Sequence, residues 1–198
     1  MRLGLIAALA ALAALGPTAD AAAGGIAVET KIAAYPVAGK SGEELLLQMN
    51  RKGPRHGFLT RAIAQTSYVV KWDFAWESEK GGCRLKDADA RLAITYTYPR
   101  ATSKMPAALA RKWQTFLRGV RRHEETHGTL ARRMVAAAQR SIAGVAFPRD
   151  AGCRAARAEV KRRVDAVYAV YESRQRAFDA REHADNGKVV RLVEALAR

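Results

Sequence analysis

The sequence has only two cysteines and four histidines among its 198 residues. Two cysteines are too few for a disulfide-framework miniprotein or a four-thiolate zinc module. After residue 21 there is no apolar run of the roughly 20 residues that a membrane-spanning helix needs, and no repeat of solenoid or propeller period. With 49% hydrophobic residues, residues 22–198 are long enough to form one domain with its own core.

Residues 1–21 have the parts of a secretory signal peptide. Arg2 is a short positive region, Leu3 to Leu15 is apolar, and Ala19-Asp20-Ala21 offers a cleavage site of small residues. No cysteine follows the apolar run, so a lipid anchor is not indicated. The sequence therefore predicts an exported protein, periplasmic or secreted, with no transmembrane segment in the mature chain.

Export determines how the two cysteines are interpreted. In an oxidising compartment two thiols in one small domain usually pair, which predicts a disulfide between Cys83 and Cys153. Such a bridge would stabilise the fold by roughly 4 kcal/mol in the chain-entropy model. The alternative is two separate buried thiols.

Charge is distributed unevenly along the chain. The net charge is +15, and residues 100–198 hold 22 basic against 10 acidic side chains, a net charge of +12. Because the arginines recur through helical segments, a solvated helix face is the expected arrangement. An anionic envelope surface is a possible partner. No nucleic-acid-binding signature is present, so no specific nucleic-acid partner is predicted.

The first half of the mature chain predicts strands. Ile26 to Val37 alternates polar and apolar residues, and Thr66 to Trp76 carries aromatic and branched side chains on one face. A third alternating run, Leu92 to Tyr98, predicts an antiparallel hairpin with the second, with Cys83 at its bend. Between the first two runs, Ser41-Gly42-Glu43-Glu44 predicts the start of a short helix.

The second half predicts two long helices. Pro106 suits a helix start, and Ala107 to Ile142 continues without proline. A second helix is expected from Asp150 to about His183. Strands followed by helices predict an α+β fold, in which the sheet and short helix pack on the two long helices.

The first long helix carries a motif with metal chemistry. His123-Glu124-Glu125-Thr126-His127 fits H-E-x-x-H, and residues at i and i+4 share one helix face, so both imidazoles can bind one zinc ion. Glu124 adjoins the first ligand, where its carboxylate can act as general base on an attacking water. The alternative is two surface histidines on a charged helix, since Arg121, Arg122 and Glu125 surround the motif.

The third ligand is expected from the second long helix. Asp179, Glu182 and His183 lie at i, i+3 and i+4 and share a face. His183 is the best ligand type of the three, with Asp179 and Glu182 as alternatives. The metzincin class is excluded, because Leu130 and Arg133 stand where its glycine and third histidine would be.

The order of motifs resembles a known family. It runs through Gly53-Pro54, the tryptophan-rich strand, Gly82-Cys83, Tyr98-Pro99, Trp113-x-x-Phe116, His123-Glu124-x-x-His127 and Cys153. This order, over nearly the whole mature chain, resembles the bacterial domain of unknown function 922, described as predicted secreted zinc-dependent proteases. That family ends near Tyr-Asp-x-x-Thr-x-His-Gly. The counterpart here, Phe178 to His183, departs from it at three positions.

Residues and resemblance together predict a zincin-like metalloprotease-type domain over residues 22–198. The expected activity is that of an exported zinc-dependent metallohydrolase, a peptidase acting on peptide or protein substrates. His123, His127 and His183 would hold Zn²⁺, and Tyr168 or Tyr171 would stabilise the oxyanion. The alternative is a non-catalytic basic envelope protein that binds an anionic surface or partner and carries a structural or vestigial metal site.

Overall fold

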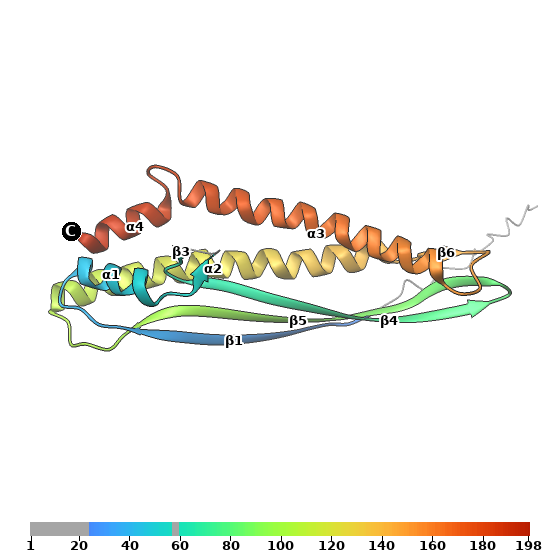
Figure 1. Ribbon diagram of the computed structural model, residues 1–198, viewed down its shortest axis with the longest axis horizontal. Helices are drawn as coiled ribbons and strands as arrows, with labels where there is room; N and C mark the ends of the chain where they lie inside the picture. Colours follow the sequence, from blue (N-terminus) through green and yellow to red (C-terminus); the bar gives the residue numbers. More distant parts are fainter. Residues whose placement is uncertain (1–23, 57–59) are drawn as a thin grey trace, which may run out of the picture.

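The computed structural model describes residues 24–56 and 60–198; the expected signal peptide lies outside these residues. The elements in chain order are β1 (Ile26–Val37), α1 (Gly42–Lys52), β2 (Arg55–His56), β3 (Thr60–Arg61), β4 (Gln65–Glu79), β5 (Gly82–Ala101), α2 (Ala107–Ile142), β6 (Ala146–Phe147), α3 (Arg154–Glu182) and α4 (Lys188–Ala197). The long strands form an elongated sheet, α2 runs along it, and α3 packs against α2 (Figure 1). None of the helices in the described residues is long and apolar enough to cross a membrane.

The sheet has the order β1-β5-β4, with β5 in the centre and β6 paired to its start. β4 and β5 form the expected antiparallel hairpin, in which Ser78 pairs with Cys83 next to the turn. β1 pairs with β5 in parallel. Alternate residues of β5 are buried, because one face of the sheet packs on α2 while the other faces solvent.

The core lies between the sheet and α2. Leu92 and Ile94 of β5 and Phe116 of α2 are almost completely buried in it. On α2 the buried residues recur at helical spacing, so one stripe of the helix faces the sheet and the neighbouring helices. α3 closes the second part of the core with Val160 and Val164.

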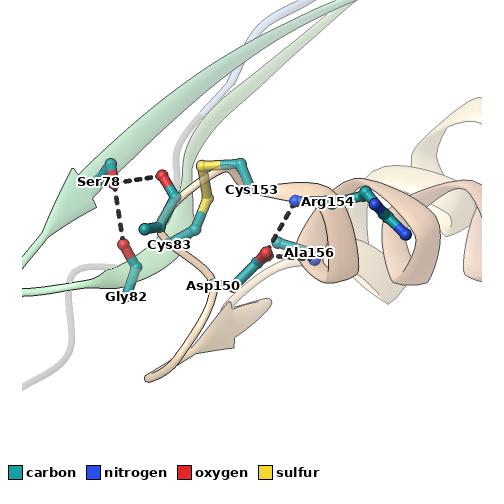
Figure 2. Close-up of a disulfide and its surroundings, with 8 residues drawn as sticks. Ser78, Gly82, Cys83, Asp150, Cys153, Arg154 and Ala156 are labelled. Atoms are coloured by element: carbon teal, nitrogen blue, oxygen red, sulfur yellow. Dashed lines mark hydrogen bonds between the residues drawn. A yellow bond between two sulfur atoms is a disulfide. The ribbon is translucent and has the colours of Figure 1, made fainter.

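A disulfide joins the sheet to the start of α3. Cys83 and Cys153 are bonded, with a Cα–Cα distance of 5.1 Å across a separation of 70 residues. Nearby, Asp150 accepts hydrogen bonds from the backbone N–H groups of Arg154 and Ala156, at 2.8 and 2.9 Å (Figure 2). Asp150 thus satisfies N–H groups that the first turn of a helix leaves without partners. The predicted disulfide is confirmed.

The α+β fold class is also confirmed. α2 has the bounds that its sequence predicted, and the short helix begins after Ser41, whose hydroxyl accepts a hydrogen bond from the backbone of Glu44. Two features go beyond the sequence prediction, namely the parallel pairing of β1 and the final helix α4, which packs on α2 and α1.

Candidate metal centre

The H-E-x-x-H motif lies near the middle of α2 and divides the helix into two faces. His123 and Glu124 point inward and are buried, with exposed fractions of 8% and 6%. Arg121, Arg122 and Glu125, the charged neighbours in the sequence, all lie on the exposed face. The motif is therefore not a pair of surface histidines.

Gly128 allows α2 to lie close to the sheet directly beside the motif. A Cβ atom at this position would come within 1.9 Å of the hydroxyl oxygen of Tyr96 on β5. That separation is far below any van der Waals contact, so every larger residue would push the helix or the tyrosine away. The depth of the motif under the surface thus depends partly on this glycine.

α3 runs antiparallel to α2 and brings a carboxylate to the two histidines. Asp179 Oδ1 lies 2.8 Å from His127 Nε2 and 3.2 Å from His123 Nε2. The two Nε2 atoms are themselves 3.2 Å apart. Three polar atoms from two helices therefore form a nearly equilateral triangle.

Gln175 determines which ring nitrogen of His127 carries the hydrogen. Its Nε2 donates to the backbone oxygen of His127 at 3.2 Å, which orients the amide, and its Oε1 faces His127 Nδ1 at 2.5 Å. Nδ1 must carry the hydrogen in that contact, so in the neutral ring Nε2 is bare. A bare Nε2 facing the carboxylate of Asp179 places two acceptors against each other, which requires a proton or a cation between them.

The pKa values of Asp179 and His127 are shifted by the contacts between these side chains. Burial alone would raise the pKa of Asp179, but its hydrogen bonds with His123 and His127 hold that pKa below its ordinary value. Burial lowers the pKa of His127, but the contacts with Asp179 and Gln175 outweigh it and raise that pKa. The site therefore favours positive charge between these side chains.

His183 and Glu182 lie at the end of α3 and approach His123 from different sides of its ring. The donor atoms of His183, His123 and Asp179 all lie within 4.8 Å of one another, and His183 is exposed. Burial, and then the neighbouring His123, lower the pKa of His183. Glu182 instead approaches Nδ1 of His123, at the opposite end of the ring from the triangle.

Glu124 is held in place by β4. The hydroxyl of Thr66 lies 2.7 Å from Glu124 Oε2 and 3.0 Å from the backbone oxygen of Glu124. Because a buried carboxylate without a donor is costly, this contact fixes the side chain in one orientation. Glu124 lines the same cavity as His123, His127, Asp179 and His183.

This cavity has a volume of about 820 Å³ and extends from the triangle to the start of β4. Its wall includes Ile63, Thr66 and Tyr68. Tyr168 and Tyr171, the tyrosines expected to stabilise an oxyanion, are not among its lining residues in the described part of the chain. The hydroxyl of Tyr168 instead accepts a hydrogen bond from Trp72 Nε1 at 2.9 Å, so Tyr68 replaces both as the candidate.

Comparison with known proteins shows the family. The sequence profile described as "Bacterial protein of unknown function (DUF922)" matches residues 32–187. The chain belongs to this family. The match runs from within β1 to the loop before α4 and so includes the H-E-x-x-H motif, Asp179, His183 and the disulfide. No curated protein and no solved structure matches the chain.

Proposed function

We propose that this DUF922 protein is a zinc-dependent peptidase, with His123, His127 and Asp179 as the metal ligands. The observation that carries the proposal is the triangle of Nε2, Nε2 and Oδ1, with edges of 2.8 to 3.2 Å. A tetrahedral ion with bonds of about 2.1 Å requires ligand atoms about 3.4 Å apart, close to these edges. Two imidazoles and one carboxylate are also a donor set that catalytic zinc sites use.

His183 is proposed to contact the substrate and not to bind the metal. The sequence favoured it as third ligand, but Asp179 makes the shorter contacts with both histidines of the motif. Catalytic zinc keeps one coordination position open for water or substrate. His183 is exposed and lines the cavity, so it would lie beside that open position and contact substrate there.

Glu124 is the proposed general base. Zinc bound by these donors would supply Lewis acidity to a scissile carbonyl and to the attacking water. Glu124 would take the proton of that water and return it to the leaving amine. Thr66 would hold one carboxylate oxygen, and Tyr68, whose pKa burial raises, would remain a neutral hydroxyl donor for the oxyanion.

The position of the cavity favours an extended peptide as substrate. Gln65, Thr66 and Tyr68 line it from the start of β4, and β4 is an edge strand of the described sheet. An edge strand offers unpaired backbone groups to an extended chain. Apolar wall residues such as Ile63 and Val189 would receive a hydrophobic substrate side chain.

The test compares Glu124→Gln with Glu125→Gln on a broad peptide library. Both variants lose one negative charge from neighbouring positions of α2, but only Glu124 is buried and lines the cavity. We expect Glu124→Gln to keep zinc and lose at least roughly 10²-fold in cleavage rate, the low end for a positioned base. Glu125→Gln should cleave like wild type. Equal loss in both variants, or full activity in Glu124→Gln, would contradict the mechanism.

A further inference from the structure

His123 has one ring nitrogen that the metal site does not use. Its Nε2 belongs to the donor triangle, whereas Nδ1, at the other end of the ring, is buried and has no hydrogen-bond partner among the described residues. Phe178 stacks on the ring with a centroid distance of 4.8 Å and an interplanar angle of 26°. The ring plane is therefore fixed by packing, while Nδ1 remains free to donate.

Glu182 lies on the Nδ1 side of this ring. Its Oε2 is 3.9 Å from His123 Nδ1, and its Oε1 is 3.6 Å from Lys188 Nζ. The carboxylate is buried, with an exposed fraction of 7%, at the wall of a second cavity of about 430 Å³. Burying a carboxylate is costly unless it is paired, and this one has only these two long contacts to charged or titratable groups among the described residues.

We propose that Glu182 is a positioning residue that accepts a hydrogen bond from Nδ1–H of His123 when the proposed zinc is bound. A shift of about 1 Å brings Oε2 within hydrogen-bond distance, and the second cavity gives the side chain room to move. The bond would keep the hydrogen on Nδ1 and leave Nε2 bare as a metal ligand. This inference rests on the proposed function.

The other histidine of the motif supports this role. His127 already has such a partner, because Gln175 Oε1 faces its Nδ1 at 2.5 Å. Histidines that bind metals almost always donate their second N–H to a carboxylate, a carbonyl or water. For His123 the corresponding acidic side chain is Glu182, at 3.9 Å from Nδ1. The two ligands would thus have different partners, a neutral amide and a carboxylate.

The test measures binding of zinc alone to Glu182→Leu and Glu182→Gln, with Glu194→Leu as the control. Glu194 lies on the adjacent helix α4 and is exposed, and among the described residues its ion pair is with Arg198, at 3.1 Å. We expect Glu182→Leu to weaken zinc binding by roughly 10- to 100-fold, the usual cost of losing such a partner. Glu182→Gln should lose less, since its amide oxygen still accepts, and Glu194→Leu should stay within about twofold of wild type.

A spectroscopic readout separates positioning from general damage to the fold. In zinc-loaded protein with ¹⁵N-labelled histidine, the Nδ1–H resonance of His123 should shift in both Glu182 variants and stay unchanged in Glu194→Leu. If Glu182→Leu fails to fold, Glu182→Gln decides, and unchanged affinity with an unchanged resonance overturns the inference. A wild type that binds no zinc would instead overturn the proposed function, and the positioning role with it.

Discussion

Removing the disulfide should cost more stability than any single contact at the proposed metal centre. The bridge between Cys83 and Cys153 closes a loop across 70 residues and restricts the unfolded chain accordingly. For that length the chain-entropy relation gives about 4 kcal/mol at 25 °C. At about 2–4 °C per kcal/mol for a domain of this size, the double variant Cys83→Ala/Cys153→Ala should melt about 8–16 °C lower.

The assays are thermal and guanidinium unfolding of the wild type and of the double variant, both followed by far-UV circular dichroism. Wild type treated with a non-thiol reductant is the control, because it loses the bridge but keeps the buried sulfur atoms. Zinc affinity should be unchanged, since the bridge lies at the start of α3, whereas the proposed ligand Asp179 lies near its end and His123 and His127 lie near the middle of α2. If the unfolding free energy of the double variant lies within about 1 kcal/mol of wild type, this reasoning is refuted. The disulfide would then contribute only as much as the least stabilising disulfides known.

Four further outcomes are expected. Gly128→Ala should destabilise the fold by about 1–3 kcal/mol in chemical unfolding, because its Cβ has no space; a stabilised variant would contradict the close packing. Thr66→Val should lower turnover of cleaved peptides and Thr66→Ser restore it, since the hydroxyl contacts the proposed general base Glu124; equal rates would refute that contact. Asp179→Asn should lose more zinc affinity by calorimetry than His183→Ala, and the reverse order would make His183 the third ligand. Hydrogen bonds from backbone N–H groups lower the pKa of Asp150 below its ordinary value of 3.8. Asp150→Asn should therefore be less stable than wild type above pH 3.8, and this difference in stability should vanish as the pH falls through the lowered pKa. A difference in stability that stays constant with pH would contradict this.

The first three helices were predictable because their signals are local. Ala107 to Ile142 alternates buried and exposed residues at helical spacing and has a proline just before it, so its bounds follow from the sequence. The motif histidines were predictable for the same reason, since i and i+4 share a face in any helix. The hairpin of β4 and β5 is also local, with a turn at Gly81.

The remaining features depend on contacts between distant segments. β1 pairs with β5 across more than 60 residues, and nothing in its alternation specifies a parallel partner. Thr66 belongs to a predicted strand and Gln175 to a predicted helix, yet their contacts with Glu124 and His127 arise only from the packing of β4 and α3 on α2. The sequence named Asp179 only as an alternative ligand, because residue type favoured His183 and the distances that favour Asp179 require both helices.

The most direct test of the proposed metal centre is the zinc content and zinc affinity of residues 22–198, prepared without chelator, beside the same protein with His127→Ala. We expect one zinc ion per wild-type chain. We also expect a sharp loss of zinc affinity in His127→Ala with an intact far-UV spectrum, because neither Thr126 nor Gly128 offers a replacement ligand. A wild type without zinc, or a His127→Ala variant that binds zinc as tightly, would show that these histidines do not hold a metal.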